Sequence, residues 1–168
     1  MDGYLFDASA LSAYLNEQHP YNGKATAIID AIPLDALRFV SVVTIGEIQY
    51  GIRRAEGEHA ARLDEYRERL STIRKHPLLD VTRHTADVYA ELKSKLAAKV
   101  LRKAGKKLPR WIEDWVSTGS GKRLQIDEND LWIAAQAKER DLVLVTGDAD
   151  LRNLQAVDPE LRLLLTRD

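Results

Sequence analysis

The chain has 168 residues, of which 45% are hydrophobic and 30% charged, and its formal net charge is −1. This composition is typical of a globular protein, and the length suits one domain, which we expect to span residues 1–168. The absence of cysteine excludes zinc–thiolate sites and cysteine nucleophiles. The N-terminus and the apolar runs predict neither a secretory signal nor a membrane span, which favours a cytoplasmic protein with no membrane partner.

Short apolar runs rich in Val, Leu, Ile and Phe predict five strands, and their lack of polar–apolar alternation is typical of strands buried on both faces of a parallel sheet. Apolar residues at spacings of three and four predict helices between the strands, so the sequence indicates an α/β fold. We expect two helices between the second and third strands, and region 83–116 is long enough for two more. The strands are expected at residues 3–6, 38–43, 78–82, 142–146 and 161–165.

Four acidic residues stand where an apolar run meets an expected helix: Asp7, Glu47, Asp130 and Asp148. In an open parallel sheet the carboxyl ends of the strands share one edge, and ligands bind there. Acids far apart in the sequence are therefore expected to meet in one pocket, although no clear strand precedes Asp130. A cluster of carboxylates is unfavourable by itself because like charges repel, and a divalent cation removes that cost.

These acids also have a purely structural interpretation as helix caps. Asp7 suits a helix N-cap, Asp148 suits an Asx turn, and Asp127 suits the cap of the helix that follows it. Thr44 and Glu47 have the spacing of a capping box, in which Thr44 would cap the helix. Capping does not require all four sites to lie at one edge of a sheet. Helix N-termini also keep acids ionised, so capping and metal binding are compatible.

The available donors favour a hard cation. Several carboxylates, no cysteine and scattered histidines fit Mg²⁺ or Mn²⁺ better than zinc. Such an ion can lower the pKa of a water and stabilise the charge that develops on a phosphate during phosphodiester hydrolysis. Carboxylates alone would repel that substrate. The sequence therefore predicts a metal-dependent nuclease.

Four motifs in order resemble those of the PIN-domain family and, within it, the toxin ribonucleases of VapBC-type toxin–antitoxin pairs. The opening strand with its acid is similar to Tyr4-Leu5-Phe6-Asp7-Ala8-Ser9, and the second motif to Ser41-Val42-Val43-Thr44-Ile45-Gly46-Glu47. The third motif matches Glu128-Asn129-Asp130-Leu131-Trp132, and the fourth resembles Leu144-Val145-Thr146-Gly147-Asp148. Each motif alone is weak, but the set spans nearly the whole chain.

The resemblance implies a three-layer α/β/α fold around a parallel sheet of about five strands. It also implies an endoribonuclease that depends on Mg²⁺ or Mn²⁺, a cognate antitoxin, an RNA substrate and a homodimer. Asp7, Glu47, Asp130 and Asp148 correspond to metal ligands and catalytic acids of the family. Polar residues that would support them are Ser9, Thr44, Asn129 and Thr146.

The chain departs from the family pattern in two places. In the fourth motif Asp150 competes with Asp148 for the role of the fourth acid, and we favour Asp148. The stretch 110–122, which holds two tryptophans and a Gly/Ser run, is longer than the family leads us to expect. We therefore expect a basic helical segment and an insertion at about 93–123 within the single domain.

The basic segment is a candidate RNA contact. Residues 93–110 contain eight Lys or Arg and no acid, and Trp111 and Trp115 follow. Cations bind phosphates and aromatic faces stack on unpaired bases, so both suit RNA. A solvated helix face, two packed tryptophans or a docked partner are the alternatives, and Trp132 is expected to pack into the core. The RNA contacts that we expect are Arg53, Arg54, Lys103, Lys106, Lys107, Arg110 and Trp111.

Two other functions compete with the nuclease. One is a catalytically inactive PIN-like protein that binds RNA or a partner, and the presence of all four acids argues against it. The other is phosphoryl transfer on Asp7, for which haloacid-type phosphatases place a second Asp where this chain has Ser9. A receiver domain would need a lysine near the end of a late strand, and Thr146-Gly147-Asp148 supplies none.

Overall fold

The structure is a computed structural model, which describes residues 2–58, 61–100 and 109–167. The strands are β1 (Gly3–Phe6), β2 (Leu37–Ser41), β3 (Leu78–Leu79), β4 (Val143–Thr146) and β5 (Arg162–Leu165). The helices are α1 (Ala8–Leu15), α2 (Asn22–Asp30), α3 (Val42–Gly57), α4 (Leu63–Ile73), α5 (Arg83–Val100), α6 (Glu128–Glu139) and α7 (Arg152–Gln155), with 3₁₀ turns η1 (Ile112–Asp114) and η2 (Ala149–Leu151). Among the described residues, no helix is both long enough and apolar enough to span a bilayer.

The five strands form one parallel sheet in the order β3-β2-β1-β4-β5. Its centre is β1, where Phe6 is aligned with Val40 of β2 and Val145 of β4. The chain leaves these three strands at the same edge, because β1 ends at its aligned residue and β2 and β4 end one residue later. This register brings the ends of β1, β2 and β4 together.

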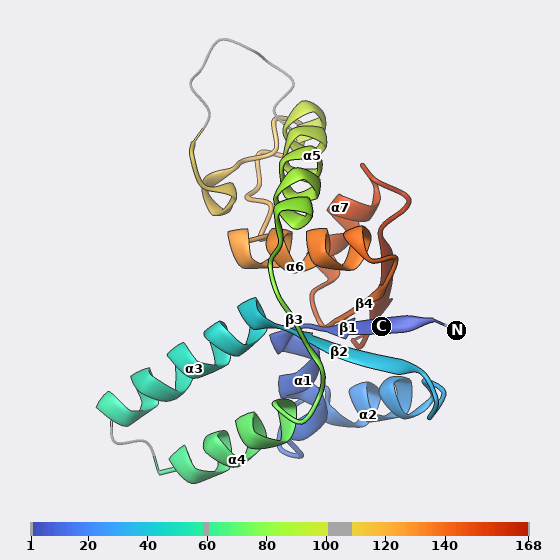
Figure 1. Cartoon of the computed structure of the whole chain (residues 1–168). Coiled ribbons are helices and arrows are strands. Elements are labelled where there is room, and N and C mark those ends of the chain that lie inside the picture. The colour runs from blue at the N-terminus through green and yellow to red at the C-terminus, as the bar shows by residue number, and fades with distance from the viewer. Residues whose placement is uncertain (1, 59–60, 101–108, 168) are drawn as a thin grey trace.

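Helices cover both faces of the sheet, and each face has its own hydrophobic core (Figure 1). Successive side chains of a strand point to opposite faces, so Leu5 joins one core and Phe6 the other. The core of Leu5 packs against α5, α6 and α7, and the core of Phe6 packs against α1, α2, α3 and α4. The predicted three-layer α/β/α fold with a parallel sheet of five strands is confirmed.

Two strands end earlier than we predicted. β2 ends at Ser41 instead of residue 43, because Ser41 accepts a hydrogen bond from the Val43 N–H and starts α3. β3 contains only two residues, so the remainder of the run 78–82 is not in the sheet. Region 83–116 contains one long helix, α5, followed by the short turn η1 among its described residues.

The expected insertion connects α5 to the start of α6. Trp115 is buried and its ring nitrogen donates to the Pro109 carbonyl at 2.9 Å. Glu128, the first residue of α6, accepts hydrogen bonds from the backbone N–H of Ile112 at 3.1 Å and from the side chains of Tyr89 and Lys93 on α5. The insertion thus holds the first turn of α6. The single domain of residues 1–168, with a basic helical segment and an insertion at about 93–123, remains a prediction.

The tryptophans have three different environments. Trp115 is buried, whereas Trp111 is 51% exposed and has the Arg110 guanidinium 4.7 Å from its ring centre. We predicted that Trp132 packs into the core, and this prediction is wrong. Trp132 is half-buried and stacks on the Tyr89 ring with 3.9 Å between ring centres, because the second residue after Asp130 faces α5.

Part of the basic segment is used internally. Lys93 pairs with Glu128, and Lys95 forms ion pairs with Glu91 at 2.5 Å and with Asp158 at 2.8 Å. These lysines therefore do not form a free basic face. Lys103, Lys106 and Lys107, which we predicted to contact RNA, lie outside the described residues.

Candidate functional site

The first and fourth acids stand at the ends of the two central strands. Asp7 follows β1, and its backbone N–H donates to the Val145 carbonyl of β4 at 3.1 Å. Its carboxylate caps α1 by accepting from the Ala10 N–H at 2.8 Å, so the predicted N-cap is confirmed. Asp148 forms the predicted Asx turn, since its carboxylate accepts from the Asp150 N–H at 2.8 Å.

Glu47 lies in the second turn of α3 and not at its start. The helix is capped by Ser41, so the predicted capping box of Thr44 and Glu47 is wrong. Ser41 is fully buried and also donates to the side chain of Gln136 on α6, which makes it the better-supported cap. Thr44 is buried inside the helix, and its hydroxyl has no hydrogen-bond partner among the described residues. No hydrogen bond among the described residues therefore supports the expected role of Thr44 beside the acids.

The N-terminus of α6 supplies the third acid. Asp127 and Asp130 form a reciprocal capping box, in which each carboxylate accepts from the backbone N–H of the other at 2.8 and 3.0 Å. The Asn129 side chain donates to the Glu47 carboxylate at 3.1 Å. This bond joins α6 to α3, so the start of α6 reaches the pocket although no strand precedes it.

Ser9 connects the ends of β1 and β4. Its hydroxyl lies 2.8 and 2.9 Å from the two Asp7 carboxylate oxygens and accepts from the Gly147 N–H at 2.8 Å. The Thr146 hydroxyl is 3.4 Å from Ser9 and accepts from the Asp148 N–H at 2.9 Å. The predicted polar neighbours Ser9, Thr146 and Asn129 thus contact the acids directly.

Burial and mutual repulsion perturb all four acids. Burial raises the pKa of Asp7, against hydrogen bonds that lower it, and the charge of Asp148 raises it further. Burial also raises the pKa of Glu47 to about 7, where the charges of Asp127 and Asp7 contribute. The pKa of Asp130 rises to about 8, first through burial and then through the charges of Asp127, Asp148 and Asp7. The acids are therefore close enough for the charge of one to raise the pKa of another.

Asp148 is a better candidate than Asp150 for the fourth acid. Burial raises the pKa of Asp148, and its charge in turn raises the pKa of Asp7 and of Asp130. Asp150 raises the pKa of Asp148, but it lines a different hollow together with Leu96 of α5.

Sequence reasoning missed two charged members of the cluster. Asp127 was considered only as a cap, yet its charge raises the pKa of Glu47, Asp130 and Asp148. Arg167 follows β5, and its charge lowers the pKa of Asp148. The predicted last strand was the available indication for Arg167, because its carboxyl end shares an edge with the end of β4.

The acids fit a divalent cation by their chemistry, although their side chains do not form a ready-made cage. Within the described ranges, no three Asp, Glu or His side chains are arranged as a metal-binding group. The oxygens of Asp7, Glu47 and Asp130 are instead held by Ser9, Asn129 and the Asp127 backbone. Carboxylates that repel one another and resist ionisation are the donors that a hard cation would stabilise.

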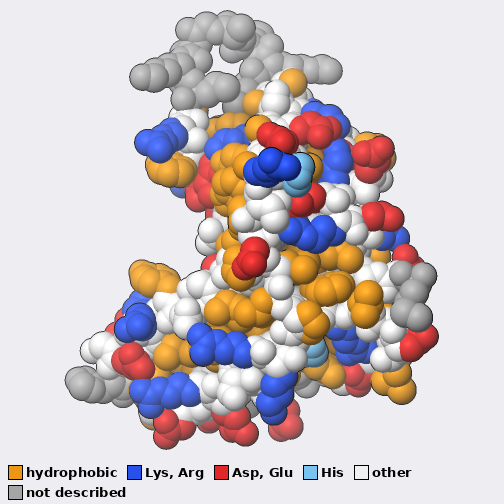
Figure 2. All heavy atoms as spheres, viewed as in Figure 1, with side chains coloured by type: hydrophobic (Ala, Val, Ile, Leu, Met, Phe, Trp, Pro, Cys, Tyr) orange, Lys and Arg blue, Asp and Glu red, His pale blue; other side chains and the backbone are white. Residues whose placement is uncertain are grey.

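A hollow of about 460 Å³, here called the Glu47 hollow, opens beside the second acid. It lies between α3 and the start of α6, where the surface is indented in Figure 2. Arg53 and Arg54 line other hollows, so these two predicted RNA contacts do not border this one. The residues that line the Glu47 hollow are Val43, Gly46, Glu47, Tyr50 and Asn129.

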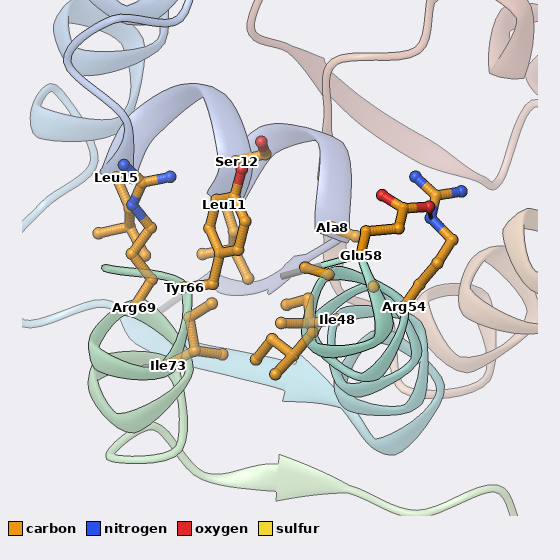
Figure 3. A pocket seen from close by; sticks show the side chains of 13 residues that line it. Ala8, Leu11, Ser12, Leu15, Ile48, Arg54, Glu58, Tyr66, Arg69 and Ile73 are labelled. Atoms are coloured by element: carbon orange, nitrogen blue, oxygen red, sulfur yellow. Dashed lines mark ion pairs between the residues drawn. The ribbon is translucent and has the colours of Figure 1, made fainter. Parts of the chain in front are cut away.

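A second hollow of about 350 Å³, the α1–α3–α4 groove, lies between those three helices (Figure 3). Its apolar lining includes Leu11 and Ile48, with Tyr66 from α4. Arg54 and Glu58 form an exposed ion pair of 3.8 Å at one end of it. The groove contains none of the four acids, so it is a surface separate from their cluster.

The family model described as the PIN domain matches residues 4–157. No curated protein matches the chain in sequence.

Solved structures share its fold. VapBC2 from Rickettsia felis, bound to a promoter DNA fragment, has a TM-score of 0.64 at 18% identity, covering 96% of this chain and 97% of that one. VapBC-5, a toxin–antitoxin system member from Mycobacterium tuberculosis, has a TM-score of 0.56 at 25% identity, covering 100% of both chains. VapC20 from the same organism, a toxin that cleaves the sarcin–ricin loop, has a TM-score of 0.55 at 14% identity, covering 93% and 95%.

Proposed function

Because this chain belongs to the PIN-domain family, we propose that it is an endoribonuclease that depends on Mg²⁺ or Mn²⁺ and acts as the toxin of a toxin–antitoxin pair. The observation that carries the proposal is the electrostatic effect of the acids on one another. The charge of Asp7 raises the pKa of Glu47 and Asp130, and the charge of Asp148 raises the pKa of Asp7 and Asp130. The RNA-cleaving neighbour VapC20 supports RNA as the substrate.

The four acids would hold the divalent cation, with Asp127 adding to the negative charge around it. When bound, the ion would supply an activated water and stabilise the charge that develops on the phosphate. Asn129 orients Glu47, and Ser9 holds both oxygens of Asp7. These neutral donors fix the carboxylates without neutralising them, which keeps their charge available for the cation.

The decisive experiment measures cleavage of an unstructured RNA with and without Mn²⁺ or Mg²⁺. We expect cleavage with the metal, none with EDTA, and losses of more than about 100-fold in Asp7→Asn and Asp130→Asn. Asp64→Asn is the matched control, because that side chain is 99% exposed at the start of α4. The proposal is wrong if the wild-type protein cuts no RNA with either metal, or if the two site variants cut as well as the control.

The remaining RNA contacts are part of the proposal. Arg110 and Trp111 precede Ile112, whose backbone N–H donates to Glu128 at the start of α6, and this place in the chain supports them as RNA contacts. Lys103, Lys106 and Lys107 precede them in the chain and stay predicted contacts. A catalytically inactive binding protein is less well supported, because all four acids are present in the sequence.

We propose a cognate antitoxin as the protein partner, and a homodimer as the assembly. The partner is supported by the similar structure of VapBC-5, a member of a toxin–antitoxin system. An apolar segment of the antitoxin would fill the α1–α3–α4 groove, since Ile48 and Leu11 line this hollow, which is separate from the acids. The protein would act in the cytoplasm.

A further inference from the structure

The wall of the Glu47 hollow carries the most exposed aromatic side chain of the described residues. Tyr50 is 70% exposed and lines the hollow together with Glu47 and Asn129. Single apolar residues on a surface are common, but this ring stands at the candidate active site. Its position, and not its exposure alone, points to a ligand.

Tyr50 follows Glu47 by three positions on α3, so the two side chains are neighbours one turn apart. Within the part of the chain that the structure describes, no hydrogen bond or ion pair holds the Tyr50 side chain. A Cβ added at Gly46, on the same wall, would meet nothing within 4 Å. The face of the ring is thus open to a flat group that enters beside the Glu47 carboxylate.

We propose that Tyr50 binds a nucleobase by stacking, next to the phosphodiester that the acids act on. This inference rests on the proposed function and deepens it, because a base can stack on a side chain only when it is unpaired. The substrate at the point of cleavage is therefore single-stranded RNA. Stacking is tolerant of sequence since every base has a flat face, so Tyr50 selects for an unpaired nucleotide more than for a particular base.

The contents of the hollow favour a nucleotide over a protein segment. Tyr50 supplies an aromatic face, Asn129 supplies an amide, and Glu47 would help hold the cation that attracts a phosphate. A volume of about 460 Å³ suits a ligand of this size. The α1–α3–α4 groove, with its largely apolar lining, is the surface that we assign to the protein partner.

The test compares substitutions at Tyr50 in the full chain. A short unstructured RNA labelled with fluorescein is titrated in Ca²⁺ to measure binding, and KM and kcat are measured in Mn²⁺. We expect Tyr50→Ala and Tyr50→Leu to weaken binding about tenfold, with the loss in cleavage falling mainly on KM, and Tyr50→Phe to keep the wild-type affinity. Leucine keeps the apolar area, so a difference between Leu and Phe isolates stacking from burial.

A second variant tests the hollow without changing Tyr50. Gly46→Leu places a side chain in the open space beside the ring, and we expect it to weaken RNA binding as well. Gly23→Leu is its matched control, because Gly23 is a helical glycine of α2 that also has no atom near an added Cβ. Leu34→Ala, at a residue 97% exposed away from the hollow, is the control for loss of apolar surface.

The possible outcomes distinguish a failure of the Tyr50 proposal from a failure of the proposed ribonuclease function. If the wild-type protein cuts RNA and Tyr50→Ala binds it equally well, the inference is overturned while the ribonuclease stands. If Tyr50→Ala loses the antitoxin but not RNA, the ring docks a protein and the inference is also overturned. If the wild-type protein neither binds nor cuts RNA, both proposals fall.

Discussion

Ser9 contacts the ends of two neighbouring strands at the candidate site. Its hydroxyl is shared between the Asp7 carboxylate and the Gly147 backbone, so it ties the first strand to the turn that presents Asp148. A Cβ built at Gly147 would lie 3.1 Å from the Ser9 hydroxyl. A larger residue at position 147 would therefore displace Ser9 or Arg167.

Ser9→Ala tests this role. The change removes a donor from Asp7 and leaves the buried Gly147 N–H without its partner, so we expect a loss of roughly 1–3 kcal/mol in stability. Cleavage should fall about 10–100-fold because Asp7 is no longer held. Unfolding by urea and kcat/KM in Mn²⁺ measure the two effects. Ser12→Ala, exposed one turn later on α1, is the control, and equal behaviour of the two variants would refute the role.

At the residue scale, the sequence was sufficient where an acid directly follows a strand. Asp7 and Asp148 were placed correctly relative to β1 and β4, because the strand pattern and the cap agree. Arg167 was missed because its approach to Asp148 depends on the pairing of β4 with β5, which no local pattern records. Asp127 was missed as a site residue because its capping role already accounted for it.

At the scale of the elements, the start of α3 shows why a local motif can mislead. Ser41 and Thr44 are both suitable caps by residue type. Which of the two caps the helix depends on Gln136 of α6. Its side chain accepts a hydrogen bond from Ser41 and donates one to the Leu79 carbonyl at 3.0 Å, so a contact with α6 fixes the residue at which β2 ends. That contact joins residues 95 positions apart, and sequence spacing alone does not contain it.

The α1–α3–α4 groove yields a prediction about α3. A Cβ added at Gly51, which lines the groove, would meet nothing within 4 Å. Gly51→Gln should therefore stabilise the helix by about 0.5–1 kcal/mol, because glycine is a poor helix former. The same side chain would project into the groove, so we expect binding of the antitoxin to weaken at least about tenfold.

The two effects have opposite signs, which makes the experiment discriminating. Thermal unfolding measures the first, and titration with the protein encoded by the adjacent reading frame measures the second. Gly23→Gln, at a glycine of α2 that also has no atom near an added Cβ, should bind the antitoxin normally. An unchanged affinity in Gly51→Gln would place the partner elsewhere.

For the whole molecule, the buried acids couple stability to pH. The pKa of Asp130 is raised from 3.8 to about 8, so the folded state favours its protonated form. The stability that this gives is complete below pH 3.8 and is lost as the pH rises through about 8. Glu47 acts in the same direction, over the range from 4.5 to about 7.

We therefore compare the free energy of unfolding in EDTA as the pH rises from about 5 to about 8. Over this range we expect Asp130→Asn to lose less stability than the wild type. The difference should be roughly 1–2 kcal/mol, because solvent screens part of the effect. Asparagine can still accept from the Asp127 N–H, which preserves the cap. Urea unfolding at both pH values provides the measurement, and saturating Mn²⁺ should stabilise the wild type more at the higher pH. Parallel pH profiles of the two proteins would contradict this account.

The contacts among Tyr89, Lys93 and Glu128 have a consequence for how these three positions vary in evolution. If any one of these three side chains is lost, a charge or a hydroxyl of the others has no partner beside the first turn of α6. Substitutions there should therefore have accumulated jointly. Homologues that lack the acid at the position of Glu128 should also lack the lysine, and an alignment in which the two positions vary independently would speak against such joint inheritance.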